Sequence, residues 1–432
     1  MTEKIAVIGG GISGLSAAYF ALKKGNSVDL FEGAGRLGGL AASFDFNGLN
    51  IEKYYHFICG NDFELVNFAE ELGIGDKLHF RPSKLSFFYN GKFYRFGSPL
   101  NLLRFSPISL LSRIRFGLNV VSSKYTKDWE KLDEISAKEW LTKKIGRHAY
   151  QVIWYPLLKV KFGEYYDYIS AAWIWHRIHR VATSRKGIFS KEKLGYFDGG
   201  SQTLVDATEK KIKAMGGHVF LKSKVMGIEK IQDRYRLSFG SEEPRDYDKI
   251  VLAVPLPVAA SLVEKLNPDY ADRLAGIDFI GVVCGIFRLK QPVSDAFWLN
   301  INDPRTPSNG LIEYTNLNPL KEIAPHSIAY IPFYMPVKNP WFSRTEKDLK
   351  AEFVHVLKTI KPDIRDDAII DFRVFKSRHA QAICTMGFQY RVPKAATPLS
   401  NLFLIDSTQL YPSDRSLSGL IGLAEKLADQ WL

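Results

Sequence analysis

A glycine-rich turn near the amino terminus constrains the fold more than any other feature of this chain. Gly9, Gly11 and Gly14 follow the apolar run 5–8 and fit the pattern G-x-G-x-x-G. A continuous apolar run indicates a strand buried on both faces of a parallel sheet. The small residues after the turn predict a helix, and residues 27–32 predict a second strand. The sequence therefore opens as a βαβ unit.

The turn has the features of a dinucleotide site. The first glycine permits the tight turn, the second lets the backbone approach a pyrophosphate, and the third allows the helix to pack closely on the strand. The free N–H groups at the start of the helix face the anion. Glu32 ends the second strand about twenty residues later, where a carboxylate accepts hydrogen bonds from the adenosine ribose. A dinucleotide is therefore expected here.

Length and composition narrow the class of protein. A chain of 432 residues is too long for one ordinary core, which predicts two connected domains. The scattered cysteines Cys59, Cys284 and Cys384 indicate neither a disulfide framework nor a metal site. The longest mostly apolar run, 250–263, contains two prolines and is too short to span a bilayer. Since no signal peptide precedes the first strand, we expect a cytoplasmic protein.

The net charge of +12 is unevenly placed along the chain. Residues 77–127 contain ten Lys or Arg and ten Phe or Tyr, but no Asp or Glu. One interpretation is a solvated basic face over an aromatic core. The other is a surface that attracts anions, namely a phosphate-bearing substrate, an acidic membrane on its inner face, or nucleic acid. Both interpretations remain open from the sequence.

The stretch after Glu32 indicates which dinucleotide binds. Residues 33–40 read GAGRLGGL and resemble the extended dinucleotide motif of the FAD-dependent superfamily that contains monoamine oxidases, protoporphyrinogen oxidases and phytoene desaturases. Residues 48–57 are similar to that superfamily's continuation toward the flavin ring. The resemblance implies FAD as the cofactor. The residues it implies in this half of the site are Gly9, Gly11, Ile12, Ser13, Gly14, Glu32, Gly33, Arg36, Gly38, Gly39, Leu40, Tyr54, Tyr55 and His56.

The carboxyl-terminal segment supplies a second resemblance. Residues 401–406, followed by 417–428, are similar to the superfamily's closing strand, aspartate, loop and helix. This implies that Asp406, Ser407 and Leu417 bind the cofactor and that the helix N-terminus faces the flavin O2/N1 edge. The sequence departs from the superfamily in the link 411–416, which is not glycine-rich. The alternative for Asp406 is a simple turn residue.

The middle of the chain resembles the same superfamily. Residues 199–204 and 221–228 are similar to its central block, which implies that the backbone of Val225 contacts the adenine. Residues 161–165 and 169–173, together with the basic segment, look most like the protoporphyrinogen-oxidase-like branch.

The expected fold is α/β, with a discontinuous Rossmann-type FAD-binding domain of the glutathione-reductase kind and an interleaved α+β substrate domain. The segments expected in the FAD-binding domain are 1–80, 196–255 and 385–432, and those expected in the substrate domain are 81–195 and 256–384.

Acid–base residues are harder to find, because flavin chemistry needs little from the protein beyond positioning and electrostatics. In monoamine oxidases a lysine lies below flavin N5. The comparable stretch here, 281–289, has Cys284 and Arg288 but no internal lysine, which argues against a plain amine oxidase. Cys384 is roughly placed for covalent flavin attachment, but its neighbours do not match, so we expect a buried free thiol.

His56 is the candidate catalytic residue. Residues 52–56 can be aligned with the acid-x-Gly-Gly/Pro-His segment of UDP-galactopyranose mutases, in which the histidine lies beside the flavin, although Tyr54 and Tyr55 replace the small residues. The alternative for His56 is a hydrogen-bonded core residue.

Three classes of function follow. The first is a flavin oxidoreductase that removes a hydride from a C–N or C–C bond of a large or anionic substrate, which the basic segment suggests is phosphate-bearing and lipid-linked. The second is a mutase-like flavin isomerase that acts on a nucleotide- or polyprenyl-linked sugar. The third is a binding protein, and the lack of a recognised nucleic-acid module argues against nucleic acid as its partner.

Overall fold

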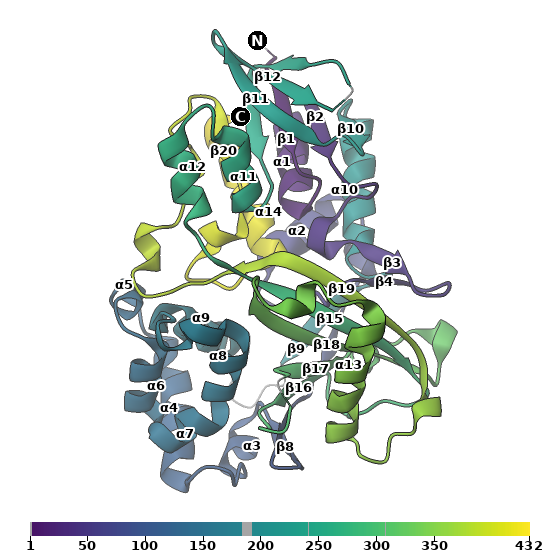
Figure 1. The fold of residues 1–432 in the computed structure, drawn as a ribbon, viewed down its shortest axis with the longest axis vertical. Coiled ribbons are helices and arrows are strands. Elements are labelled where there is room, and N and C mark those ends of the chain that lie inside the picture. The colour runs from purple at the N-terminus through teal and green to yellow at the C-terminus, as the bar shows by residue number, and fades with distance from the viewer. Residues whose placement is uncertain (1, 184–191, 241, 307) are drawn as a thin grey trace.

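The computed structural model describes residues 2–183, 192–240, 242–306 and 308–432. Both termini lie at one end of the molecule, in a unit built around a parallel sheet (Figure 1). A helical lobe and a large, mainly antiparallel sheet lie side by side at the other end.

The parallel sheet brings together strands from distant parts of the chain. Its order is β10 (His218–Leu221), β2 (Ser27–Glu32), β1 (Lys4–Ile8), β14 (Lys249–Leu252) and β20 (Leu402–Leu404). Every neighbouring pair is parallel, so the carboxyl ends of all five strands lie along one edge. The predicted Rossmann-type α/β fold is confirmed by this sheet and its helices.

Strand β1 is buried on both faces, which explains its continuous apolar run. Ile5 and Val7 pack with the helices on one face, whereas Ala6 and Ile8 belong to the core on the other face. The helices of the first face are α1 (Ile12–Lys23), α2 (Phe63–Glu71), α10 (Gln202–Ala214) and α14 (Leu417–Trp431). The second face is covered by a small antiparallel sheet, β11 (Val225–Ile231), β12 (Arg234–Phe239) and β13 (Arg245–Tyr247), and by α11 (Leu256–Val263) and α12 (Pro268–Ala275).

A seven-stranded sheet dominates the other half of the molecule. Its order is β19 (Ile369–Ala382), β15 (Phe279–Leu289), β18 (Ser327–Pro336), β17 (Gly310–Glu313), β16 (Trp298–Ile301), β7 (Leu85–Tyr89) and β8 (Lys92–Phe96). Strands β7 and β8 form a hairpin, whose turn residues Asn90 and Gly91 are both at positive φ. Helix α13 (Glu346–Ile360) packs on this sheet, and Gly285 leaves room for the Phe353 ring.

The helical lobe consists of α3 (Pro99–Leu103), α4 (Leu110–Ser123), α5 (Trp129–Asp133), α6 (Ala137–Ile145), α7 (Arg147–Ile153), α8 (Tyr155–Phe162) and α9 (Ala171–Thr183). The stretch between Pro99 and Ser123 is two helices and not one. Pro107 lacks an N–H, and Ser109 caps a new helix by accepting a hydrogen bond from the Ser112 N–H at 3.2 Å. In the described ranges, no helix combines the length and the apolar character needed to cross a bilayer.

Short strands connect the two halves. Strands β3 (Ser43–Asp45) and β4 (Asn50–Glu52) form a hairpin. Strand β9 (Lys193–Phe197) pairs with both β5 (Ile58–Cys59) and β6 (Leu78–Pro82).

Candidate functional site

The three glycines of the amino-terminal turn have different surroundings. Gly9 has a φ of +110°, and a Cβ there would lie 2.3 Å from the carbonyl oxygen of Ala253. A Cβ on Gly14 would lie 1.8 Å from the carbonyl oxygen of Gly9, so α1 packs closely on the turn. A Cβ on Gly11 would meet nothing within 4 Å. The backbone at Gly11 is therefore open, which fits the close approach of a pyrophosphate.

Glu32 is fixed to this turn by its carboxylate. Its Oε2 accepts a hydrogen bond from the Gly10 N–H at 2.7 Å, and its Oε1 accepts one from the Ala34 N–H at 2.7 Å. The segment after Glu32 folds back on the turn, because the Gly38 N–H donates to the Gly10 carbonyl at 2.8 Å. The acid, the glycine turn and the Gly-Gly pair thus form one structural unit.

The other predicted residues of this half lie along the same segments. Ile12 and Ser13 begin α1, Gly33 is exposed, and Gly39 and Leu40 lie in a 3₁₀ turn after Gly38. Arg36 is exposed, and its Nη2 donates to Asn50 Oδ1 at 3.3 Å.

Val225 is brought to the Glu32 end of the sheet. It is buried and is the first residue of β11. The residues just before it bind the segment around Glu32: the Ser223 N–H donates to the Glu32 carbonyl at 3.0 Å, and the Lys222 N–H donates to the Ala34 carbonyl at 2.9 Å. These bonds hold the segment that leads into Val225 against the residues around Glu32, while the contact of Val225 with adenine stays a prediction.

The carboxyl-terminal segment reaches the same edge of the sheet. After β20, the Ile405 N–H donates to the Leu252 carbonyl at 2.9 Å. The Asp406 carboxylate accepts hydrogen bonds from the Thr408 N–H at 2.8 Å and from the Thr408 hydroxyl, and thereby caps the 3₁₀ turn Ser407–Leu410. Asp406 therefore stabilises a turn, as the alternative interpretation of the sequence expected. Its contact with a cofactor stays a prediction.

Helix α14 begins at Leu417, close to this turn. Ser416 caps it by accepting a hydrogen bond from the Gly419 N–H at 3.0 Å. Unpaired N–H groups give a helix N-terminus a partial positive charge. The glycine turn and the start of α14 come from opposite ends of the chain and lie at the carboxyl edge of one sheet, where α/β proteins bind ligands.

Glu52 links the segment of the candidate histidine to α10. Its buried carboxylate accepts hydrogen bonds from the Ser201 N–H at 2.8 Å, from the Ser201 hydroxyl and from the His56 N–H at 3.3 Å. Burial raises the pKa of Glu52 to about 7 despite these three donors. Glu52 therefore holds the backbone of His56 in place.

His56 is half-buried, and its buried Nδ1 has no hydrogen-bond partner among the described residues. Burial, and secondarily the nearby Arg415 guanidinium, lower the pKa of His56 to about 4. Its imidazole is therefore neutral at neutral pH. The neighbouring Tyr55 hydroxyl lies 3.2 Å from the hydroxyl of Tyr334, and burial raises the pKa values of both Tyr54 and Tyr55.

A buried cluster of cations was not found from the sequence. Lys161 on α8 is only 5% exposed, and its Nζ lies 4.8 Å from the ring centre of Tyr334 and 4.9 Å from that of Trp173. On α9, the Arg177 guanidinium lies 4.9 Å from the same Trp173 ring. Arg415 lies 5.5 Å from the Tyr334 ring and directly precedes the N-cap of α14.

One carboxylate serves this cluster. Asp414 forms an ion pair with Arg177. Burial acts to raise the pKa of Asp414, but Arg177, Lys161 and Arg415 together hold it below its ordinary value. The signal that could have revealed the cluster is the departure of 411–416 from a glycine-rich link, because Asp414 and Arg415 are the residues that replace it.

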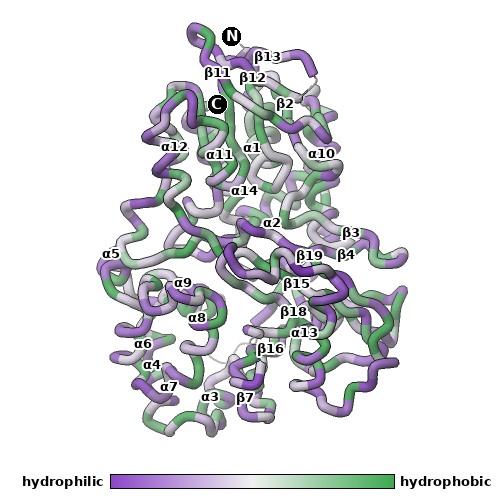
Figure 2. The backbone as a smooth tube through the Cα atoms, viewed as in Figure 1, coloured by the Kyte–Doolittle hydropathy of each residue, from purple (hydrophilic) through white to green (hydrophobic). Residues whose placement is uncertain are grey.

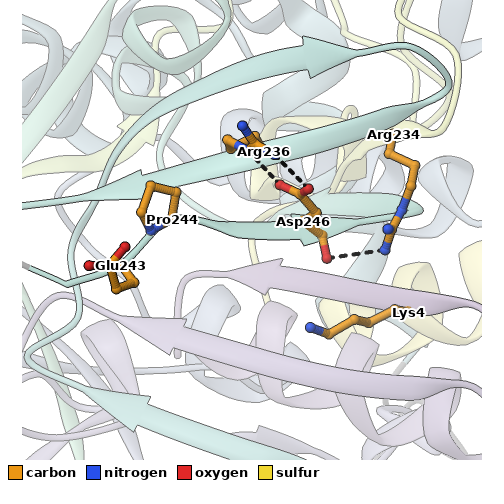
Figure 3. Close-up of a pocket in the computed structure, with 6 residues that line it drawn as sticks. All are labelled: Lys4, Arg234, Arg236, Glu243, Pro244 and Asp246. Atoms are coloured by element: carbon orange, nitrogen blue, oxygen red, sulfur yellow. Dashed lines mark hydrogen bonds and ion pairs between the residues drawn. The ribbon is translucent and has the colours of Figure 1, made fainter.

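A surface pocket lies away from these residues. It is lined by Lys4, Arg234, Arg236, Glu243, Pro244 and Asp246 (Figure 3). Asp246 is already bound by Arg236 through two hydrogen bonds of 2.7 and 2.8 Å. Since Lys4 begins β1, the pocket lies at the opposite end of the strands from the glycine turn. Across the described ranges, no three His, Cys, Asp or Glu side chains form a group that could hold a metal ion.

The parallel sheet, the glycine turn and the hydrogen-bonded carboxylate of Glu32 define a protein with a Rossmann-type dinucleotide-binding fold. The chain belongs to the family of flavin-containing amine oxidoreductases, whose family model matches residues 12–410. It is 23% identical to 15-cis-phytoene desaturase of Synechococcus elongatus, over 99% of this chain and 95% of that protein. It is 28% identical to protoporphyrinogen oxidase 2 of Arabidopsis thaliana, over 35% of this chain and 30% of that protein.

A solved structure of reduced UDP-galactopyranose mutase has the same fold. It matches with a TM-score of 0.75 and 16% identity, over 99% of this chain and 93% of that one. The predicted membership in this superfamily is therefore confirmed.

Proposed function

We propose that the protein is an FAD-dependent oxidoreductase that removes a hydride from a C–N or C–C bond of a large or anionic substrate. The observation that carries this proposal is the placement of the glycine turn and the start of α14 at one edge of the parallel sheet. A dinucleotide long enough to contact both would present its reactive ring to the cation cluster. Membership in a family of flavin-containing oxidoreductases supports the same conclusion.

The residues present fit FAD. The open backbone at Gly11 would hold the diphosphate, Glu32 the ribose, and the backbone of Val225 the adenine. When bound, the flavin accepts a hydride and carries it to an acceptor. The other predicted contacts are Gly9, Ile12, Ser13, Gly14, Gly33, Arg36, Gly38, Gly39, Leu40, Tyr54, Tyr55, Asp406, Ser407 and Leu417. The domain division given above belongs to this proposal.

The chain's own residues would supply electrostatics and proton handling. The N-terminus of α14, together with Arg415, provides positive charge where a reduced flavin would develop negative charge. The neutral imidazole of His56 offers a free Nδ1, which can accept or donate one hydrogen bond at the substrate. His56 is therefore the proposed catalytic residue.

The test is anaerobic reduction of the FAD-loaded protein by candidate substrates. Bleaching of the oxidised flavin absorbance by an amine or by an unsaturated or cyclic substrate would identify the bond that is oxidised. A His56→Gln variant loaded with FAD should reduce the flavin at least tenfold more slowly than the wild type, because the variant loses an imidazole placed for proton transfer. Unchanged reduction by this variant would remove His56 from the chemistry.

A second candidate is a flavin-dependent isomerase that acts on a nucleotide- or polyprenyl-linked sugar. Two observations favour it: the free Nδ1 of His56, and strand β15, which contains no lysine along 281–289. Such an enzyme would work only with prereduced FAD and would consume no oxidant. Turnover that consumes one oxidant for each product would exclude it.

We also propose peripheral association with an acidic membrane through the outer face of α4. Leu111, Ile114, Leu118 and Val121 recur at helical spacing and are exposed, Leu111 at 65% and Leu118 at 64%. The α4 segment carries both hydrophobic and hydrophilic positions (Figure 2). The surrounding segment 77–127 is basic, with no acidic residue, and a basic amphipathic helix is typical of proteins that bind the surface of acidic membranes.

A further inference from the structure

Three cationic side chains from three separate elements converge on two aromatic rings. Lys161 of α8 and Arg177 of α9 each lie 4.9 Å from the centre of the Trp173 ring. Lys161 and Arg415 lie 4.8 and 5.5 Å from the centre of the Tyr334 ring of β18. The cations from α8, α9 and the link before α14 therefore form one cluster around two shared aromatic rings.

The cluster has more positive groups than partners for them. Arg177 has an ion pair with Asp414. Arg415 donates to neutral acceptors, Gln381 Oε1 at 2.8 Å and the Tyr334 hydroxyl at 3.2 Å. Lys161 makes no hydrogen bond or ion pair within the described part of the chain, although it is only 5% exposed. Buried charges are ordinarily paired, so this arrangement lacks an anion.

We propose that the substrate carries a carboxylate or a phosphate and that this group binds between Lys161, Arg177 and Arg415. The inference deepens the proposed function by naming the substrate class, and it rests on that function only in treating the anion as part of the substrate. The guanidinium groups supply directional donors, and the Lys161 ammonium supplies a third positive group beside the same two rings.

Binding has a consequence for protonation. Burial lowers the pKa of Lys161 first, and Arg177 and Arg415 lower it further, whereas the facing Asp414 and Cys384 act to raise it. The unliganded amine therefore holds its proton less tightly than an exposed lysine does. A bound anion offsets burial and the two guanidinium charges, so it raises the pKa of Lys161 and stabilises the ammonium form.

Calorimetry of the FAD-loaded protein with two probes, benzoate and phenyl phosphate, tests this proposal. Benzyl alcohol is the neutral control. Titrations at pH 7.5 give the affinity of each probe. At least one anion should bind more tightly than benzyl alcohol. Binding of benzoate alone assigns a carboxylate substrate, and binding of phenyl phosphate alone assigns a phosphate.

Three variants separate binding from folding. Lys161→Met should weaken anion binding on the order of tenfold or more. Lys161→Arg should retain anion binding, because a guanidinium keeps the positive charge. Lys159→Met, on the exposed side of the same helix, is the matched control and should leave anion binding unchanged.

The proposal is overturned if neither anion binds more tightly than benzyl alcohol, or if Lys161→Met binds the anion as tightly as the wild type. If Lys161→Met fails to fold, loss of anion binding in a folded Lys161→Arg variant overturns the proposal instead. The flavin absorbance of each preparation is read separately. If the protein binds an anion but holds no flavin, the anion site is supported and the proposed oxidoreductase function is contradicted.

Discussion

At the scale of single residues, Gly9 and Gly11 belong to one motif but meet different physical demands. Gly9 has a positive φ and packs against Ala253, so its glycine is required by the fold. Gly11 has an extended backbone with a φ of −73°, and a Cβ there would touch nothing. Packing and backbone conformation therefore do not require glycine at position 11, whereas the close approach of a bound ligand would.

The two glycines give a matched pair of variants. Gly11→Ala should leave the free energy of unfolding of the apoprotein within about 0.5 kcal/mol of wild type, while FAD affinity falls by about tenfold or more, because the methyl group enters the space of the pyrophosphate. Gly9→Ala should lower the free energy of unfolding by about 2 kcal/mol or more. Denaturant unfolding and FAD titration measure the two quantities. Full FAD affinity in Gly11→Ala would contradict the placement of the diphosphate.

Glu52 gives a prediction about pH. Its pKa is about 7 in the folded protein, above the ordinary value of 4.5, so its contribution to stability is fully present below pH 4.5 and is lost as the pH rises through 7. Between these values the wild type should lose about 3 kcal/mol of unfolding free energy relative to Glu52→Gln. The comparison is made at each pH, because burial also raises the pKa of Glu313 to about 7. If the unfolding free energies of the wild type and Glu52→Gln change with pH in parallel, Glu52 is already ionised at pH 4.5 and stays so up to pH 7. That result would contradict the prediction.

The glycines, Glu32 and His56 could be named from the sequence because each belongs to a local pattern. Lys161, Arg177 and Arg415 could not, since their proximity depends on how α8, α9 and the link before α14 pack in three dimensions. The hydrogen bonds between Asp406 and Thr408 could not be predicted from the sequence either, because an aspartate after a strand can stabilise a turn or bind a ligand.

At the scale of elements, local chemistry sets where the helices begin. Thr345 and Asp348 form a capping box at the first turn of α13. Ser136 likewise caps α6 by accepting a hydrogen bond from the Glu139 N–H at 3.1 Å. In the stretch 99–125, α3 ends at Leu103 and Ser109 caps the start of α4, so the stretch is not one helix.

Helix α4 carries the prediction about membranes. Replacing Leu111, Ile114 and Leu118 by Gln should reduce binding to vesicles that contain phosphatidylserine on the order of tenfold or more at low salt, because three apolar side chains no longer enter the interface. Unfolding free energy should stay near wild type, since these side chains are exposed. Val258→Gln with Ile370→Gln is the control, at exposed apolar positions outside the basic segment. Equal sedimentation with neutral and acidic vesicles would remove the membrane proposal.

At the scale of the whole molecule, the chain crosses between its two halves several times. The parallel sheet takes strands from near both ends and from the middle of the sequence, in the order β10, β2, β1, β14 and β20. The resemblance of separate segments to one superfamily predicted this type of fold. Strand order, register and the pairing of β9 with β6 could not be predicted, because they depend on contacts between residues far apart in the chain.

The central claim is that one FAD molecule spans from the glycine turn to the start of α14. The absorption spectrum of the purified, folded protein, taken before and after addition of FAD and removal of the excess, tests it most directly. The protein should show the bands of oxidised flavin at one FAD per chain, and the Gly11→Ala variant should lose them. A folded wild-type protein that stays colourless after incubation with FAD would contradict the claim.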